Sequence, residues 1–466
     1  MEILRRSPML AILISLVSAL ALYDKFKIYA FIFGMPLIFT GVIFCSYEKN
    51  FPQQWNLFFA ALIFSALCSV RIYYGISQPD QQNFDFYNEN GTVTMLRQWG
   101  RMYAVIIETE HYGKFVARLN FAELLEGTRI NFDGSTKSFR PKNKNSDFDE
   151  GRYWKARDVK AWVNMKNVKE LPQKFSLPLM RQKISRTLTI YTPKLTSEYL
   201  KAAWLGEHTQ ELDNKHRKWG TSHLLAVSGF HVGIVILCAV FLFGGKNIAL
   251  LSLILWTYIL LTGASSSATR AGLMLQTGIF ARVIGRRISG LNSVSIAAVI
   301  LLLYRPFLFW DIGWRLSVLA ALTLSTMPPR KFIWLFVSSI IFFVTFPQVS
   351  YSFKGVPIVG ILLNIFAPLY FSFAFMIASV IVFLTLIKIP FVEILLTPVE
   401  GIFLLWEKFA DFFAKFLPYV LSWNYFTAWL GAGILIFMVC RRLNLSIIKS
   451  IFVTAALNFT AFLIFL

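Results

Sequence analysis

The sequence predicts a polytopic α-helical membrane protein with a small β-barrel domain inserted near its N-terminus. The first observation is composition: 56% of the 466 residues are hydrophobic and 15% are charged, whereas soluble domains average about 45–50% and about 25%. The second is a series of apolar runs long enough to cross a bilayer. The third is a change to strand-like alternation with glycine-bearing turns after residue 77.

Residues 1–76 are predicted to form about three transmembrane helices. The apolar runs are residues 9–23, 28–47 and 55–76. The second and third have about 20 residues, the length that a helix needs to cross roughly 30 Å of hydrocarbon. The first run is short and follows Arg5 and Arg6, so a signal peptide is the alternative. These arginines favour a cytoplasmic N-terminus, but Lys25 and Lys27 favour the opposite orientation.

Residues 77–180 are predicted to form a soluble β domain. Segments 103–108 and 114–119 have the composition of short strands, and glycines mark the turns around them. Five or so such strands suit a five-stranded barrel of OB type, and a β-sandwich is the alternative.

This β domain carries basic and aromatic residues that suit a nucleic-acid strand. Residues 135–160 include eight basic side chains together with Tyr153 and Trp154. Cations attract phosphates, and aromatic rings stack on bases. A solvated barrel rim is the alternative, because four acidic residues lie in the same stretch. The DNA-binding candidates are Lys142, Lys144, Arg152, Trp154, Lys155 and Arg157.

A polar helical connector, residues 181–222, precedes a second transmembrane domain predicted over residues 223–466. Within it, residues 267–288 and 311–325 mix polar and apolar side chains at helical spacing. This pattern is typical of helices that face a polar lumen or lie at the membrane interface. Arg270 sits among apolar neighbours, where a charge is costly and usually faces a cavity or a partner. The pattern favours a polar lumen, with interfacial helices as the alternative.

The net charge and the cysteines bear on the kind of site that this protein can contain. The formal net charge is +21, and most of the excess lies outside residues 77–222, in the apolar part of the chain. Cytoplasmic anchoring by basic residues explains only part of it. The four cysteines lie in apolar stretches without metal-ligand spacing, so they predict neither a disulfide framework nor a zinc site. We interpret them as packing residues.

The most informative segment is residues 219–233, where His223, Ser228 and His231 lie in an otherwise apolar helix start. Two imidazoles and a hydroxyl in a membrane segment need hydrogen-bond partners or water. On a continuous helix the two histidines would lie about 80° apart and face one cavity, although glycines can break the helix there.

This segment is similar to the signature of the competence ComEC family. The matching run is Ser222-His-Leu-Leu-Ala-Val-Ser-Gly-Phe-His-Val-Gly. The resemblance also includes Leu205-Gly-Glu before it and residues 261–271, 285–287, 291–293, 310–317 and 359–369 after it. It covers about residues 198–380, and such ordered agreement is more specific than any one motif.

The resemblance implies a channel that passes single-stranded DNA into the cytoplasm through the cytoplasmic (inner) membrane during natural transformation. It makes residues 223–466 the channel domain and places the OB-like domain on the periplasmic or extracellular side. The implied partners are single-stranded DNA, membrane lipid, and DNA-receptor, ATPase or nuclease components of the uptake machinery. The matching polar residues, expected to line or brace the pore, are His223, Ser228, His231, Arg270, Asn292, Asp311 and Asn364.

No catalytic activity, metal or cofactor is expected of this chain. Longer family members append a metallo-β-lactamase-like domain, and this sequence reaches residue 466 without one. It has five histidines but no His-x-His-x-Asp-His cluster for two metals. It also has no Gly-x-x-x-x-Gly-Lys-Ser/Thr loop, so the energy for transport is expected from a partner or a gradient.

Two other functions suit the same residues. Arginines and helix ends in a membrane would also serve a transporter of another anionic substrate, because they bind negative charge without distinguishing one polyanion from another. An intramembrane hydrolase would use Ser228 as nucleophile and His223 or His231 as base, since Ser228 and His231 lie three residues apart. No third, orienting residue is evident for the hydrolase.

Overall fold

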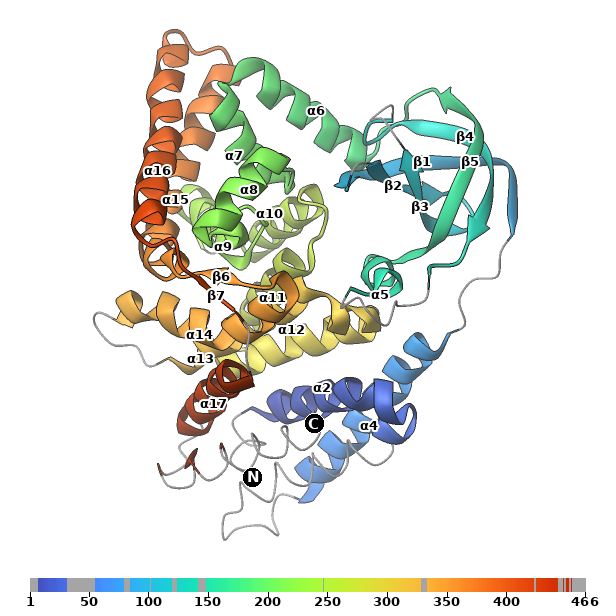
Figure 1. Ribbon diagram of the computed structural model, residues 1–466, viewed down its shortest axis with the longest axis vertical. Coiled ribbons are helices and arrows are strands. Elements are labelled where there is room, and N and C mark those ends of the chain that lie inside the picture. The colour runs from blue at the N-terminus through green and yellow to red at the C-terminus, as the bar shows by residue number, and fades with distance from the viewer. Residues whose placement is uncertain are drawn as a thin grey trace.

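The structure, a computed structural model, has the predicted class: a mostly helical membrane part beside a closed β-barrel (Figure 1). It describes residues 7–31, 55–78, 84–100, 102–119, 124–140, 148–245, 247–327, 333–422, 425–442, 447, 450–451 and 454. Lys142 and Lys144, and most of the predicted span 28–47, lie outside these residues.

Five strands form the barrel. They are β1 (Asp85–Trp99), β2 (Met102–Thr109), β3 (Gly113–Leu119), β4 (Arg129–Lys137) and β5 (Val159–Leu171). They close in the order β1-β2-β3-β5-β4, with β3 and β5 parallel and the other neighbours antiparallel. The predicted OB-type barrel is therefore confirmed, and the sandwich alternative is wrong because the sheet has no open edge.

Alternation along the strands fills the barrel and also builds a second cluster outside it. Val105 and Ile107 of β2 point into the interior with Phe115 and Phe132. Their neighbours on the opposite face of the sheet pack with Trp154 of the short helix α5 (Glu150–Lys155). This helix follows β4 and precedes β5 along the chain. The period-2 alternation of a strand thus serves two clusters at once.

Four described helices are long and apolar enough to cross a membrane. They are α2 (Pro8–Phe26), the Phe59–Ser77 part of α4 (Trp55–Ser77), the Phe336–Phe353 part of α14 (Ile333–Phe353), and α15 (Val359–Leu386). Shorter apolar helices accompany them: α9 (Gly229–Phe243), α10 (Ile248–Leu261), α12 (Gly290–Tyr304) and α13 (Ile312–Thr326). The remaining helices of this part include α11 (Ser266–Val283) and α17 (Tyr425–Arg442).

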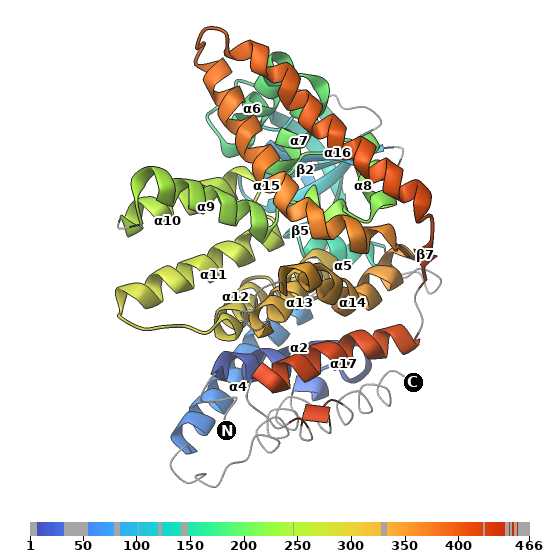
Figure 2. The same ribbon diagram turned by 90° about the vertical axis from the view of Figure 1, so that its left-hand side faces the viewer.

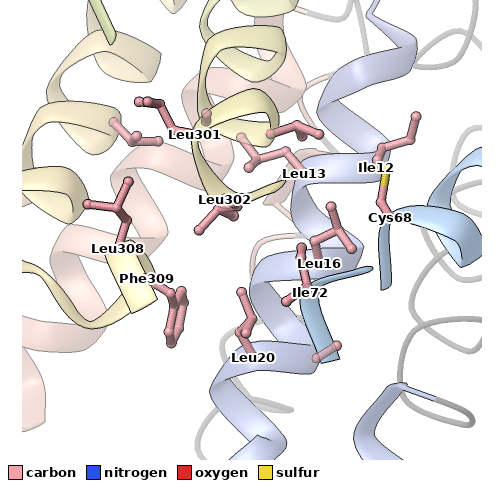
Figure 3. Packing of buried hydrophobic residues seen from close by; sticks show 14 of the residues in the cluster. Ile12, Leu13, Leu16, Leu20, Cys68, Ile72, Leu301, Leu302, Leu308 and Phe309 are labelled. Carbon is pink, nitrogen blue, oxygen red and sulfur yellow. The ribbon is translucent and has the colours of Figure 1, made fainter. Parts of the chain in front are cut away.

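The N-terminal helices belong to the core of the membrane part. Leu13 and Leu16 of α2 pack against Leu302 of α12, and Ile72 of α4 joins the same cluster (Figure 3). Phe309, in the short 3₁₀ helix η4 (Pro306–Trp310), joins it too. These contacts link segments nearly 300 residues apart in sequence, so the N-terminal spans and the second transmembrane domain are packed together.

The connector forms three helices that pack on a long hairpin. They are α6 (Leu177–Tyr191), α7 (Lys194–Leu205) and α8 (Gln210–Trp219). The hairpin consists of α15 and α16 (Leu396–Phe416), which run side by side in both views (Figures 1 and 2). Tyr199 of α7 stacks on Phe403 of α16 with ring centroids 4.6 Å apart. The start of the signature segment is therefore held by a rigid aromatic core.

Candidate functional site

The signature segment is a broken helix. Helix α8 ends at Gly220, whose φ of +68° is left-handed and favours glycine. His223 lies in the 3₁₀ turn η3 (Ser222–Leu224), and α9 begins only after Ser228. The two histidines therefore do not share one continuous helix, and the expected 80° separation does not apply.

Ser228 and His231 cap the start of α9 reciprocally. The Ser228 N–H donates to Nδ1 of His231 at 3.3 Å, and Ser228 Oγ lies 3.2 Å from the same nitrogen. Because Nδ1 accepts a hydrogen bond from the backbone, the neutral ring carries its proton on Nε2. His231 is 3% exposed, and its Nε2 has no partner among the described residues.

His223 is exposed, and it interacts electrostatically with His216 and His231. His216 of α8 is fully buried, between the Tyr199 hydroxyl at 2.9 Å from Nε2 and the Thr221 hydroxyl at 2.9 Å from Nδ1. Burial lowers the pKa of His216 to about 3, so this ring is neutral and structural. The sequence pattern did not single out His216, because its partners are fixed only by tertiary packing.

Arg270 of α11 is a buried cation, 7% exposed. Its Nε donates to Ser317 Oγ of α13 at 2.8 Å, and its Nη1 lies 2.9 Å from the Met274 sulfur. The guanidinium also approaches the start of α9 at Gly229. The structure therefore brings Arg270 beside Ser228 and His231, which are about 40 residues away in sequence.

Asp311 is the N-cap of α13 and a junction between three segments. Its Oδ2 accepts from the Trp314 N–H at 3.0 Å and from Ser266 Oγ of α11 at 3.1 Å. Its Oδ1 accepts from Arg157 of the barrel domain at 3.3 Å. Asp311 therefore braces the membrane helices and attaches the barrel to them.

The two asparagines bridge helices in different places. Asn292 Oδ1 accepts from the Met9 N–H at 3.2 Å, which joins α12 to the start of α2. Asn364 Nδ2 donates to the Gly220 carbonyl at 3.2 Å, next to a direct backbone contact between Gly220 and Gly360. Asn364 therefore supports the signature segment, whereas Asn292 lies at a separate helix contact.

The DNA-binding candidates that the structure describes contact other side chains of this protein. Arg152 pairs with Asp24 of α2 and lies over the Trp310 ring at 4.4 Å. Lys155 lies over the Phe307 ring at 5.1 Å, and Arg157 pairs with Asp311. Trp154 is 1% exposed, so its ring is not available to stack on a base. These side chains join the barrel to the membrane part, which charge and aromatic content alone did not indicate.

A second contact between the barrel and the membrane part involves Arg181 and Glu126. Arg181 Nη2 donates to the Leu205 carbonyl at 2.9 Å, and its Nη1 lies 3.5 Å from Glu126. Burial raises the pKa of Glu126 to about 7 despite the nearby guanidinium. The two residues are 55 positions apart with no shared motif, so no sequence signal connects them.

Comparison with known proteins supports the competence resemblance. A sequence profile described as "Competence protein" matches residues 205–445, more than half of the chain. The chain is 25% identical over 398 residues to ComE operon protein 3 of Bacillus subtilis (strain 168), covering 78% of this chain and 48% of that protein. It thus spans about half the length of this curated relative. No solved structure matches it significantly. On the profile match over residues 205–445, this chain is a member of the competence protein family.

Proposed function

We propose that this protein conducts single-stranded DNA through the cytoplasmic membrane during DNA uptake in natural transformation. The observation that carries the proposal is the cluster of His223, Ser228, His231 and Arg270 at a helix break within the membrane part of a competence family member. A DNA strand presents one phosphate charge per nucleotide, and its passage through hydrocarbon requires polar groups and cations along the path.

Irregular backbone at membrane depth is tolerated only where protein or water satisfies it. Residues 225–228, between η3 and α9, are such a segment, and Ser228 and His231 satisfy part of it. The exposed His223, in the adjoining 3₁₀ turn η3, supports a water-accessible path beside this segment. A polar lumen at this break is the arrangement that a channel for a polyanion needs.

The proposal extends to topology and partners. The barrel lies on the periplasmic or extracellular side, where incoming DNA arrives, and its contacts through Arg152 and Arg157 hold it over the membrane helices. A DNA receptor, an ATPase and a nuclease act as separate components. The described residues contain no group of three or more His, Cys, Asp or Glu side chains suited to a metal. Purified protein is expected to leave DNA intact with Mn²⁺ or Zn²⁺, and a chelator-sensitive nuclease activity of this chain would contradict that.

The two alternatives are less well supported by the geometry. A transporter of another anion would use the same cationic groups, and competition with DNA separates the two. For a hydrolase, Ser228 Oγ lies 3.2 Å from His231 Nδ1, which is within reach of a base. However, Nδ1 already accepts the Ser228 N–H, and no described carboxylate contacts Nε2 to orient the ring.

Uptake of labelled DNA by a strain that lacks this gene tests the channel. We expect DNA to persist at the cell surface or in the periplasm while cytoplasmic entry is lost, and the wild-type gene to restore entry. Normal entry without the gene would refute the proposal. Loss of surface binding as well would indicate a receptor rather than a channel.

Complementation with Ser228→Ala and His231→Ala separates the channel from the hydrolase. A hydroxyl that only caps a helix contributes about 0.5–1.5 kcal/mol, so Ser228→Ala should retain substantial entry. His231→Ala should reduce entry more, because it empties a buried site that shapes the break. Membrane abundance is compared by immunoblot. Abolished entry in Ser228→Ala at normal abundance, with covalent labelling of Ser228 by a serine-directed probe, would establish the hydrolase instead.

A further inference from the structure

Arg270 is a buried cation that has no counter-ion among the residues that the structure describes. Its two contacts, Ser317 Oγ and the Met274 sulfur, are neutral, and no described carboxylate forms an ion pair with it. Its Nη2 has no hydrogen-bond partner among the described residues. Burying an uncompensated charge costs several kcal/mol, so packing alone does not account for an arginine at this position.

The Nη2 end of the guanidinium faces the start of α9. A β-carbon placed on Gly229 would lie 3.6 Å from Arg270 Nη2 and 3.2 Å from the β-carbon of Ala271. The second distance is tighter than ordinary van der Waals contact, so glycine allows α9 to begin this close to α11. The guanidinium and the first turn of α9 are therefore close neighbours.

Both of these neighbouring groups are electropositive. A helix N-terminus carries about half a positive charge and unsatisfied N–H groups, and α9 has 15 residues. The N–H groups of Gly229 and Phe230 have no acceptor among the described residues. His231 does not relieve the excess charge, since its Nδ1 accepts from Ser228 and its ring offers no carboxylate-like group. Two neighbouring positive groups repel each other, and an anion that contacts both offsets this repulsion.

We propose that Arg270 and the first turn of α9 form a binding site for one tetrahedral oxyanion of the phosphate class. The guanidinium Nη2 and the N–H groups of Gly229 and Phe230 donate to its oxygens, as helix N-termini and arginines do in known phosphate sites. The ligand in transport is one phosphodiester of the DNA strand, which rests on the proposed function. The site accounts for the buried charge, the glycine and the uncapped N–H groups together.

Thermal unfolding of the purified full-length protein in phosphatidylcholine nanodiscs tests the site. Inorganic phosphate, compared with chloride at equal ionic strength, should raise the unfolding midpoint of the wild type by about 2–4 °C. Arg270→Met should lose this response, and Arg270→Lys should retain part of it because it keeps the charge. Arg282→Met is the matched control, since Arg282 lies on the same helix but is exposed, and it should respond like the wild type.

The same measurement separates a ligand site from a structural arginine. If Arg270 serves the ligand, Arg270→Met should unfold in chloride at the wild-type temperature or higher, because it removes an unpaired buried charge. If Arg270 holds the helices together, the midpoint should fall, and that result would overturn the proposal. A wild type that responds equally to phosphate and chloride would also overturn it.

Two further arms identify the source of the phosphate group. Short oligothymidylate should raise the midpoint of the wild type, but not of Arg270→Met, if a DNA phosphodiester occupies the site. A gain that requires phosphatidylglycerol in the nanodisc would assign it to a lipid headgroup and overturn the DNA assignment. If Arg270→Met loses the phosphate response but still imports DNA normally, the site stands and its place on the DNA path is refuted. Loss of import in the gene deletion tests the channel separately.

Discussion

At the residue scale, Arg181 is a buried contact between the barrel and the membrane part. Its guanidinium contacts the Leu205 carbonyl, Glu126 of the barrel, and the turn at Gly263, where an added β-carbon would lie 3.1 Å from Nη1. Gly263 also has a φ of +77°, which disfavours other residues. The 3.5 Å ion pair is too long to offset burial, and burial raises the pKa of Glu126 to about 7.

This pKa predicts that the contribution of Glu126 to stability falls between about pH 4.5 and pH 7. The ordinary pKa of glutamate is 4.5, so the folded protein binds the proton of Glu126 more tightly than the unfolded chain does. The resulting stabilisation is complete below pH 4.5 and is lost as the pH rises through about 7. It amounts to about 3 kcal/mol at most. Glu126→Gln, which keeps an acceptor for the Leu96 N–H, should remove this contribution, so the unfolding midpoint of the wild type should fall relative to that of the variant from pH 5 to 8.

The control for this titration is Glu108→Gln, because Glu108 is exposed on β2. It should leave the slope between pH 5 and 8 unchanged. If Glu126→Gln keeps the full wild-type slope, Glu126 is not the group responsible, and the raised pKa is refuted.

At the element scale, α16 docks the connector through a stripe of acidic residues. Glu400 caps the start of α7, where its carboxylate accepts from the Leu195 N–H at 2.9 Å and the Thr196 N–H at 2.7 Å. Farther along the same face, Glu407 pairs with Lys215 and Asp411 accepts from the Trp219 indole. The spacings of seven and four residues place all three on one side of the helix.

Glu400 replaces a cap that α7 lacks in its own sequence. The residue before α7 is Pro193, which has no side-chain acceptor. We therefore expect Glu400→Ala to reduce the free energy of unfolding by about 2 kcal/mol, because it removes charge-assisted bonds to two backbone N–H groups. Lys408→Ala, an exposed change on the same helix, should change it by less than about 0.5 kcal/mol.

Hydrogen exchange of the first turn of α7 provides the local readout. Faster exchange there in Glu400→Ala, with α8 unchanged, is the expected pattern because α8 has its own cap at Thr209. Equal exchange in Glu400→Ala and wild type would show that the carboxylate does not stabilise α7.

At the scale of the whole molecule, the described residues anchor the barrel to the membrane part at two places. One is the contact of α5 and its following turn with α2 and η4, through Arg152 and Arg157. The other is the pair of Arg181 and Glu126. Figure 1 shows the barrel beside the membrane helices, with α5 on its lower side and α6 leading from its left-hand side up toward α7. The first anchor lies in the connection between β4 and β5, and Glu126 lies in the connection between β3 and β4. Two anchors in different connections fix the orientation of the barrel as well as its position.

The pair of Arg157 and Asp311 should contribute measurably to this attachment. We expect a double-mutant cycle of Arg157→Met and Asp311→Asn to give a coupling of about 1 kcal/mol in denaturation in mixed micelles, since Asp311 is 9% exposed and Arg157 27% exposed. Asparagine retains an acceptor for the helix cap, so the change isolates the ion pair. Arg129→Met in place of Arg157→Met is the control, because Arg129 pairs with Glu110 within the barrel. A coupling as small as in the control would refute the anchor.

The sequence by itself determined the fold class and the family of this protein. The apolar runs, the strand-like segment after residue 77 and the ordered motifs of residues 198–380 correctly predicted a helical membrane protein, an inserted barrel and the competence family. It also pointed to Arg270 as a charge in an apolar setting. Periodicity and composition are local properties of the chain, so they can be read without knowing which segments meet.

Only the tertiary structure decided which of these residues act together. It buried Trp154 against the outer face of the barrel, turned Arg157 toward Asp311 across 154 positions of sequence, and set Gly229 beside Arg270. Lys142 and Lys144 lie outside the described residues, and their DNA binding stays a prediction. A basic residue has the same sequence signature whether it meets a phosphate, a carboxylate or an aromatic ring. Its partner is set by packing between distant segments, which no local pattern encodes.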